Sequence, residues 1–294
     1  MSSFTLTPDQ IALLPDAAEV AAYEQDGYYI SKEGVLPEAL IDAAYEGSQR
    51  FYEGERDATL PFDTGFSNWK PGDGDGQRNN EFVSLQKKEL MALAVYPLLG
   101  AIAAKLTRSG TIRLLDDQLI YKPSNTQNAS TTVTGWHADR AYWGTCSSDK
   151  LTTAWIPLHT VQVTQSPLIV MAGSHRWQGL QDVRFFSNQN LTELQEKFRQ
   201  EGKDVRIVAM TLKKGQVSFH HGWTVHGSYP NTSGQPRLSF AAHLQDGDNH
   251  YRPHRNAQGR EIHIFDEKLC RTLPNGDPDF SDPAVFPTVW SEGN

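Results

Sequence analysis

The chain has 294 residues, 38% of them hydrophobic and 10% aromatic, which is enough for one large or two small domains with a substantial buried core. Its formal net charge of −8 argues against a nucleic-acid-binding protein, which would carry a basic patch. The two cysteines, Cys146 and Cys270, lack the spacing of a metal or redox motif and therefore indicate a reducing compartment. We find no signal-peptide pattern and no run approaching the roughly 20 apolar residues of a membrane span. A cytoplasmic protein with neither membrane nor nucleic-acid partners is expected.

Helical patterns dominate the first 110 residues or so. Apolar spacing and turn residues predict helices at 17–26, from Pro37 to about Tyr52 and at 89–105, with a short strand at 28–30. Between the last two helices, residues 60–80 contain the run Pro71-Gly72-Asp73-Gly74-Asp75-Gly76, which fits neither a helix nor a strand. We interpret this segment as a surface loop, and a substrate lid remains an alternative.

Strand patterns dominate residues 111–245. The expected strands, separated by turn residues, are 111–122, 131–137, 151–158, 168–171, 205–210, 216–228 and 236–244. A polar helix is expected at 191–200, and the tail from Asp246 shows little periodicity. Helices followed by antiparallel strands predict an α+β, mainly β, fold with a jelly-roll core against which the N-terminal helices pack. We expect one domain over residues 1–294.

The segment Trp136-His137-Ala138-Asp139-Arg140 contains the motif that organises the functional prediction. In an extended strand, residues i and i+2 share a face, so the His137 imidazole and the Asp139 carboxylate can reach the same point. Two histidines and one carboxylate on one face of a metal form the arrangement that holds non-haem Fe(II) and leaves positions open. His-x-Asp is a weak signal by itself, and a third ligand is needed.

The richest source of a third ligand is the histidine-containing segment 218–228. If this segment is one strand, His226 and His221 point to opposite faces, and His220 lies about 20 Å from His226 along the strand. We therefore expect His220 and His221 to be packing and hydrogen-bonding residues. His175 is expected to fix a turn.

The residues after His226 favour it as the third ligand. Residues 230–234 form a turn, and without a bulge the returning strand places His226, Arg237 and Ser239 on one face. An arginine beside a metal is explained if an anion lies between them, because guanidinium forks a carboxylate with two hydrogen bonds. A dicarboxylate that chelates iron at one end and is bound by Arg237 and Ser239 at the other fits this set. That dicarboxylate is 2-oxoglutarate.

An ordered set of motifs resembles the phytanoyl-CoA dioxygenase family of Fe(II)/2-oxoglutarate oxygenases and covers most of residues 20–245. These motifs are Asp26-Gly27-Tyr28, Trp136-His137-Ala138-Asp139, the segments 151–158 and 171–176, His226-Gly227-Ser228, Asn231 and Arg237-Leu238-Ser239. The resemblance implies a double-stranded β-helix, Fe(II) held by His137, Asp139 and His226, and 2-oxoglutarate and O2 as co-substrates. It also implies that Trp155 lines the co-substrate pocket and that Thr134 contacts 2-oxoglutarate.

Hydroxylation of a C–H bond is the default outcome that the resemblance implies, and desaturation, epoxidation and ring closure remain open. Related halogenases lack the carboxylate ligand, so Asp139 disfavours halogenation. Arg140, Trp143 and Phe185, with Tyr142, Arg184 and Phe186 beside them, are expected at the mouth of a substrate pocket. Aromatic walls favour a mid-sized organic metabolite, and natural-product biosynthesis is one setting for such a substrate.

Two other classes of protein stay open from the residues alone. A metal-dependent hydrolase could use the same three ligands, although an arginine facing the metal is harder to explain there. A non-catalytic jelly-roll binding protein would keep the shape without turnover.

Overall fold

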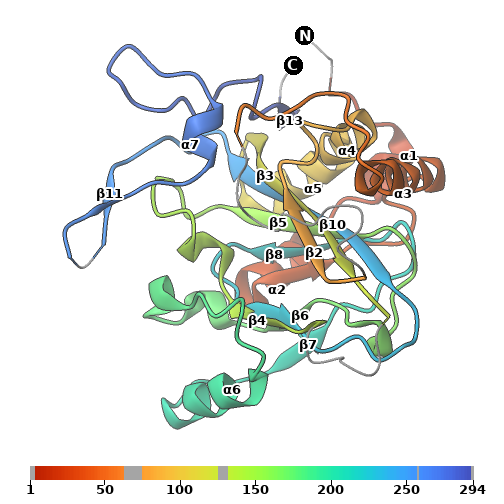
Figure 1. Cartoon of the computed structure of the whole chain (residues 1–294), viewed down its shortest axis with the longest axis vertical. Coiled ribbons are helices and arrows are strands. Elements are labelled where there is room, and N and C mark those ends of the chain that lie inside the picture. The colour runs from red at the N-terminus through yellow and green to blue at the C-terminus, as the bar shows by residue number, and fades with distance from the viewer. Residues whose placement is uncertain (1–3, 63–74, 125–131, 257, 293–294) are drawn as a thin grey trace.

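The computed structural model describes residues 4–62, 75–124, 132–256 and 258–292. Most of the loop predicted at 60–80 therefore lies outside the described residues, and its role as a lid stays a prediction. The described residues form two main antiparallel sheets, with helices on the outside of each, and a small two-stranded sheet in the C-terminal tail (Figure 1).

In the described residues before the first long strand, the structure has five helices. They are α1 (Pro8–Ala12), α2 (Ala17–Asp26), α3 (Glu38–Tyr52), α4 (Lys88–Ala94) and α5 (Pro97–Thr107). The helices expected at 17–26 and from Pro37 to Tyr52 are confirmed. The single helix expected at 89–105 is wrong, because Pro97 begins a new helix after a break at Val95 and Tyr96.

Helices α4 and α5 together span Lys88–Thr107, a 20-residue stretch long and apolar enough to cross a membrane by length and composition. The sequence expectation that no stretch approaches such a length was therefore too strong. Most of it is buried inside the protein, 61% in its most apolar 18-residue window, as is usual for core helices.

The larger sheet carries seven strands. Its main path runs β1 (Tyr28–Ile30), β8 (Ser218–His221), β5 (Thr152–Pro157), β10 (Arg237–Asp246), β3 (Thr111–Lys122) and β13 (Thr288–Ser291), and β2 (Arg78–Glu81) also pairs with β3. The smaller sheet has the order β4 (Thr134–His137), β9 (His226–Ser228), β6 (Ile169–Met171) and β7 (Ile207–Ala209). In both sheets, strands that are far apart in the sequence pair with one another, and this pairing gives the jelly-roll arrangement.

The two faces of strand β10 contact different parts of the molecule. Its even-numbered residues, Leu238 to Leu244, join the hydrophobic core beneath the N-terminal helices. Its odd-numbered residues Arg237, Ala241 and His243 line a cavity between the sheets. Because side chains alternate along a strand, one strand can anchor the helices and carry polar site residues on its other face.

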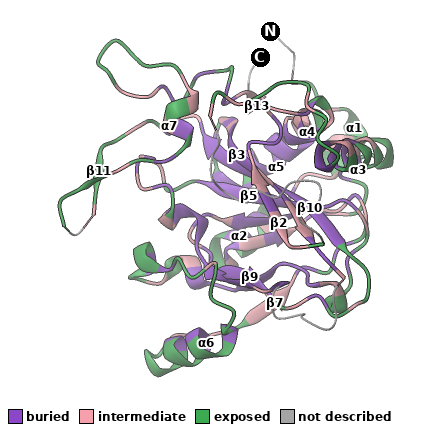
Figure 2. Cartoon of the chain, in the orientation of Figure 1, coloured by how far each residue is buried: buried purple, intermediate pink, exposed green. Residues whose placement is uncertain are grey.

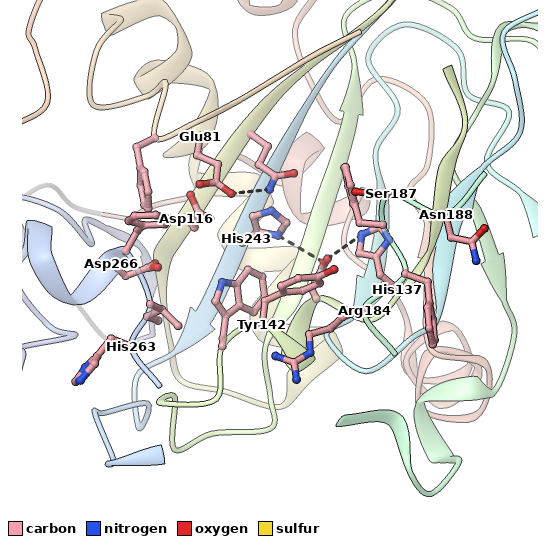
Figure 3. Close-up of a pocket in the computed structure, with 18 residues that line it drawn as sticks. Glu81, Asp116, His137, Tyr142, Arg184, Ser187, Asn188, His243, His263 and Asp266 are labelled. Atoms are coloured by element: carbon pink, nitrogen blue, oxygen red, sulfur yellow. Dashed lines mark hydrogen bonds and ion pairs between the residues drawn. The ribbon is translucent and has the colours of Figure 1, made fainter. Parts of the chain in front are cut away.

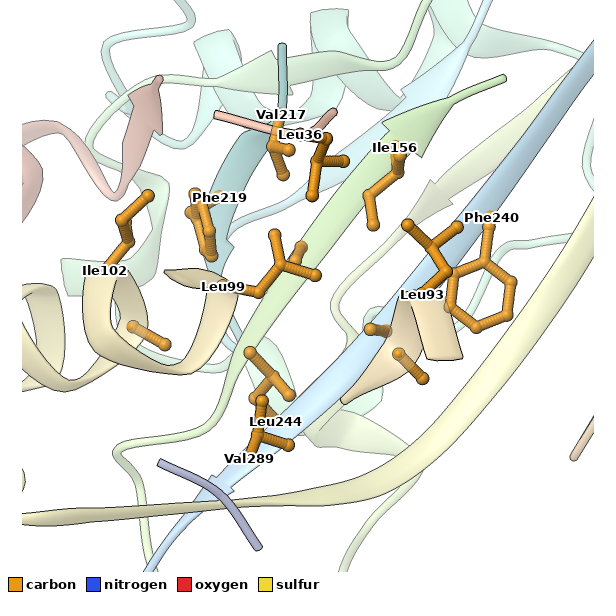
Figure 4. Packing of buried hydrophobic residues seen from close by; sticks show 14 of the residues in the cluster. Leu36, Leu93, Leu99, Ile102, Ile156, Val217, Phe219, Phe240, Leu244 and Val289 are labelled. Atoms are coloured by element: carbon orange, nitrogen blue, oxygen red, sulfur yellow. The ribbon is translucent and has the colours of Figure 1, made fainter. Parts of the chain in front are cut away.

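The main hydrophobic core lies between the helices and the larger sheet. Figure 4 shows Leu99 and Ile102 of α5 against Ile156 of β5, Phe219 of β8 and Leu244 of β10. All five side chains are at most 1% exposed, so large apolar areas are removed from water here. This core fixes the sheet that positions the site.

A second core lies on the outer face of the smaller sheet. Helix α6 (Leu191–Gln200) packs Leu194 and Phe198 against this sheet, and the Trp136 indole donates a hydrogen bond of 3.0 Å to the Leu191 carbonyl. The opposite face of α6 is exposed (Figure 2). The predicted helix has the same bounds.

The C-terminal tail is more ordered than its sequence indicated. Strand β13 returns to pair with β3, and the tail also forms β11 (His254–Arg255), β12 (Glu261–Ile262) and α7 (Asp266–Leu269). Phe280 and Phe286 pack with Trp143 in a third hydrophobic cluster. Apart from these short elements, most of the described tail has no regular secondary structure, and tertiary packing holds it in place.

Candidate metal centre and the two cavities beside it

His137, Asp139 and His226 converge at one point between the sheets. His137 ends β4, Ala138 stays extended, and Asp139 opens a single 3-10 turn (Asp139–Ala141). His226 begins β9 and is the ladder partner of His137. One potential ligand atom from each of the three side chains lies within 4.8 Å of the other two, and all three residues are buried. No other such cluster occurs in the described part of the chain.

Both imidazoles are oriented by backbone carbonyls. The Nδ1 of His137 lies 2.8 Å from the Gly135 carbonyl oxygen, and the Nδ1 of His226 lies 2.9 Å from the Thr224 carbonyl oxygen. Since a carbonyl only accepts, each Nδ1 carries the proton and each Nε2 offers a lone pair. The two Nε2 atoms lie 3.6 and 3.3 Å from Asp139 Oδ1. The donor set therefore fits a divalent cation.

Asp139 is held by a second layer of polar groups through its other oxygen. Oδ2 accepts a hydrogen bond of 2.7 Å from the Thr153 hydroxyl and lies 3.1 Å from His220 Nε2. His243 Nδ1 lies 2.8 Å from the same hydroxyl. Thus one carboxylate oxygen faces the two ligand imidazoles, while the other is fixed by the protein.

Burial and mutual charge set the protonation of the site. Burial lowers the pKa of His137 to about 3, and burial with His226 nearby lowers the pKa of His220 to about 4. Burial by itself would raise the pKa of Asp139, but the surrounding imidazoles, His226 first, hold it well below its usual range. Burial by itself would lower the pKa of His226, but the Asp139 carboxylate raises it above its usual value. The metal-free site therefore presents a carboxylate and a neutral His137 at neutral pH, and metal binding displaces the proton that Asp139 favours on His226.

His226 was identified from the sequence by an incorrect route. Residues 218–228 are not one strand, because β8 ends at His221 in the larger sheet and β9 begins at His226 in the smaller one. His220 is consequently not 20 Å away, since its ring centroid lies 4.2 Å from that of His226. His221 does turn away from the metal centre and lies beside His175.

Arg237 lies on the wall of a small cavity that also contains the three candidate ligands. It was expected to pair across a turn with the His226 strand, but β10 pairs with β3 and β5 in the other sheet. Arg237 and His226 nevertheless share the cavity, because the two sheets face each other across it. Thr134 and Trp155 line the same cavity, where the family resemblance places them.

The polar atoms around Arg237 fit a bound carboxylate. Its side chain is 2% exposed, one guanidinium nitrogen donates to the Ser166 carbonyl at 2.8 Å, and the guanidinium carbon lies 5.5 Å from the Trp155 ring centroid. Within the described residues, neither Arg237 Nε nor the buried Ser239 hydroxyl has a hydrogen-bond partner. Burial lowers the pKa of Arg237 to about 9, so the group remains charged at neutral pH.

A larger cavity of about 590 Å³ adjoins the smaller one, and His137 and Asp139 line both (Figure 3). Trp143 and Phe185 line it, as do Tyr142, Arg184 and Phe186. This volume lies in the range of small-molecule sites. The predicted aromatic walls are thus brought together beside the metal centre.

Arg140 is the exception among the predicted substrate-binding residues. Its guanidinium donates to the backbone carbonyls of Ser148, Trp143 and Cys146, and the residue is 3% exposed. Among the described residues it lines neither cavity. The side chain instead holds together the turn after the metal motif, so the predicted substrate contact has no support from this geometry.

Several residues of the larger cavity were missed from the sequence. They are Glu81 of β2, Asp116 and Gln118 of β3, His243 of β10, and His263 and Asp266 of the tail. The parity of β10 gave a usable signal for His243, since it shares the face of Arg237 and Ser239. The tail residues gave none, because their position depends on tertiary packing.

The family model for phytanoyl-CoA dioxygenase matches residues 23–239. The chain belongs to this family. Membership confirms the predicted enzyme class, a non-haem Fe(II)/2-oxoglutarate-dependent oxygenase, with iron and 2-oxoglutarate as its cofactors. The hydrolase and the non-catalytic alternative are set aside on this ground.

Two curated relatives are peroxisomal phytanoyl-CoA dioxygenases. The human protein is 22% identical over 248 residues, covering 78% of this chain and 68% of the relative. The bovine protein is 24% identical over 150 residues, covering 48% of this chain and only 41% of the relative.

Solved structures share the fold. The carbocyclase SnoK from nogalamycin biosynthesis has a TM-score of 0.67 and 23% identity, covering 93% of this chain and 96% of its own. EctD from S. alaskensis, solved with 2-oxoglutarate and 5-hydroxyectoine, has a TM-score of 0.63 and 23% identity, covering 85% and 81%. The predicted fold class is confirmed.

Proposed function

We propose that this oxygenase hydroxylates a C–H bond of a mid-sized organic metabolite. The observation that carries the proposal is the arrangement of one metal-binding donor set between two cavities. The smaller cavity ends at Arg237, and the larger has aromatic walls and a volume of about 590 Å³. Co-substrate and substrate can therefore reach the same metal from two separate cavities.

In this proposal His137, Asp139 and His226 hold Fe(II), and Arg237 with Ser239 binds the distal carboxylate of 2-oxoglutarate. Thr134 and Trp155 shape the wall of that cavity. The bound iron and 2-oxoglutarate supply the oxidising chemistry, in which O2 is consumed, 2-oxoglutarate becomes succinate and CO2, and the substrate C–H bond is oxidised. Thr153 and His220 orient the Asp139 carboxylate throughout.

The larger cavity would hold the substrate, with Trp143 and Phe185 providing apolar contact. Its position beside His137 and Asp139 brings a substrate C–H bond close to the iron. Two of the solved structures with this fold, the carbocyclase SnoK and the epimerase SnoN, come from nogalamycin biosynthesis. Their role in natural-product biosynthesis supports a metabolite of this kind. The carboxylate of Asp139 occupies the position that chloride would need, so hydroxylation is favoured over halogenation.

The test of turnover is succinate formation from 2-oxoglutarate by the purified protein in air. We expect turnover to require Fe(II). It should stop when a chelator removes the iron, and Zn²⁺ should not restore it. His137→Ala and His226→Ala should each abolish it while the far-ultraviolet circular dichroism stays unchanged. Turnover that survives both substitutions would contradict the assignment of the ligands.

A further inference from the structure

Three carboxyl groups line one side of the larger cavity. We call Glu81, Asp116 and Asp266 the acidic wall; they come from β2, β3 and α7 respectively. Figure 3 shows them on the side of the cavity opposite His137 and Arg184. Asp116 and Asp266 are 5% and 3% exposed, so they have lost nearly all contact with bulk water.

The acidic wall lacks a cationic partner within the described residues. Glu81 accepts a hydrogen bond of 3.3 Å from Gln118, and Asp116 accepts one of 2.6 Å from the Asp117 amide. Asp266 Oδ1 is buried without a hydrogen-bond partner. Of the basic groups that line the cavity, His263 lies 2.7 Å from Glu267, and Arg184 is on the side opposite the acidic wall, 3.9 Å from the exposed Asp182 (Figure 3).

Mutual repulsion and burial both act on the acidic wall. Burial and the charge of Asp117 raise the pKa of Glu81 to about 7, despite the hydrogen bond from Gln118. Burial, together with Glu81 and Glu267, raises the pKa of Asp266 to about 8, and burial with the neighbouring acids also raises that of Asp116. Buried carboxylates normally have a paired cation, so this wall has the form of a site whose counter-ion arrives with a ligand.

A second observation, independent of the acids, also indicates a polar ligand in this cavity. His243 Nε2 is buried and has no hydrogen-bond partner in the described part of the chain, although His243 lines the cavity and is 4% exposed. Aromatic rings surround the same space, with Trp143 packed edge-on against His243. An apolar body with a polar, positively charged end suits these walls.

We propose that the substrate carries a protonated amine, which the acidic wall binds while its apolar part lies against the aromatic side chains. This inference rests on the proposed function in taking the larger cavity as the substrate site. An ammonium group fits better than a second metal ion, because the carboxylates of the wall do not form a cluster with metal-ligand spacing. The ammonium offers several N–H donors to acceptors spread across one side of the cavity.

The test is a direct binding measurement on the metal-free, full-length protein, so it does not depend on turnover. The probes are a matched pair, 4-phenylbutylamine and 4-phenylbutan-1-ol, titrated by calorimetry at neutral pH. We expect the amine to bind at least about tenfold more tightly, because hydrogen bonds to charged groups are stronger than neutral ones. In Asp266→Asn and in Glu81→Gln this preference should fall to about threefold or less.

Glu196→Gln provides the matched control, because Glu196 lies on exposed α6, pairs with Arg199 and loses the same charge far from the cavity. The preference for the amine should be unchanged in this variant. Equal affinity for the two probes, weak binding of both, or equal loss in the control would overturn the proposal. Displacement of the amine by Mg²⁺ alone would make the wall a metal site and overturn it as well.

The two proposals can fail separately. If the amine preference is present but no Fe(II)-dependent succinate forms, the proposed function fails and the cation site stands. If succinate forms but the probes bind equally, the oxygenase stands and the substrate class is wrong.

Discussion

At the scale of single residues, the burial of Arg237 favours binding of a ligand that accepts its hydrogen bonds. A guanidinium that is 2% exposed keeps an unsatisfied Nε, and the Ser239 hydroxyl on the same strand face is also unsatisfied. Leaving buried donors unpaired is costly, so a ligand carboxylate at this point relieves a penalty and also gains hydrogen bonds. The same reasoning makes Asp139 a positioned ligand, because Thr153 and His220 fix its second oxygen.

Replacing Arg237 should affect 2-oxoglutarate affinity far more than iron affinity. Hydrogen bonds to charged groups contribute roughly 1.5–3 kcal/mol each, and about 1.4 kcal/mol is tenfold in affinity. We therefore expect Arg237→Ala to weaken 2-oxoglutarate binding by roughly ten- to a thousandfold, and Arg237→Lys to weaken it partially. Calorimetric titration with 2-oxoglutarate measures the affinity of both variants, and Arg199→Ala on the surface is the control. An unchanged affinity in Arg237→Ala would move the carboxylate anchor elsewhere.

Thr153→Val tests the layer behind the ligands. The substitution keeps the shape of the side chain but removes the 2.7 Å hydrogen bond to Asp139. Loss of such outer partners lowers metal affinity by about 10- to 100-fold, and we expect a loss in that range. Competition with a chromogenic chelator measures the iron affinity. Thr107→Val, at a buried threonine of α5, should leave it unchanged; equal affinities in the two variants would argue against the role of Thr153.

At the scale of elements, the break between β8 and β9 decides which histidine faces the metal. Along one continuous strand His220 and His226 would share a face but lie about 20 Å apart. The chain instead leaves the larger sheet after His221 and enters the smaller one at His226. The two sheets then bring His220 and His226 together. His221 is instead directed toward His175 at the junction with α2, where the His221 amide donates to the Gly27 carbonyl at 2.9 Å.

This arrangement predicts different results for neighbouring histidines. His226→Ala should lose tight iron binding, because the substitution removes one of the three metal ligands. His221→Ala should keep iron binding close to that of the original protein and lower thermal stability modestly, because it removes a packing residue. Metal analysis after dialysis against Fe(II) under anaerobic conditions distinguishes them. Loss of iron from His221→Ala alone would show that the strand order is wrong.

The sequence predicted those elements whose pattern is local. Helices α2 and α6 and strand β3 have the expected bounds, because caps, turns and apolar periodicity mark them. The break at Val95 and the split after His221 were missed, since both depend on where the chain packs. His137, Asp139, His226 and Arg237 were predicted together because their residue types and order carry chemistry, and the structure brings them to one cavity. Asp266 was not found, since only the packing of the tail brings it to the cavity.

At the scale of the whole molecule, the tail and β2 close one side of the cavity with carboxyl groups far apart in sequence. Their elevated pKa values result from burial in a common space, and folding therefore depends on pH. A carboxyl whose pKa is raised in the folded state binds its proton more tightly there than in the unfolded chain. Its stabilising contribution is complete below the unfolded pKa near 4 and is lost as the pH rises toward the folded value.

Asp266→Asn should accordingly reduce the loss of stability between pH 6 and about pH 8, because the pKa of Asp266 is raised to about 8. One pKa unit corresponds to about 1.4 kcal/mol, and each kcal/mol shifts the melting temperature by roughly 2–4 °C in a domain of comparable size. Between pH 6 and about pH 8, we expect the melting temperature of the original protein to fall further than that of the variant, by at least about 2 °C. Differential scanning calorimetry of the metal-free protein measures it. Parallel curves for the two proteins would mean that Asp266 is ionised throughout.

The central claim is that one iron, held by His137, Asp139 and His226, is chelated by 2-oxoglutarate whose far carboxylate is bound by Arg237. Anaerobic addition of Fe(II) and then 2-oxoglutarate tests it most directly, because chelation produces a weak visible metal-to-ligand charge-transfer band. We predict that the band appears with one equivalent of iron, is absent in Asp139→Ala and His226→Ala, and requires much more 2-oxoglutarate in Arg237→Ala. A protein that binds Fe(II) and 2-oxoglutarate without the band, or whose band persists in His226→Ala, would contradict this account.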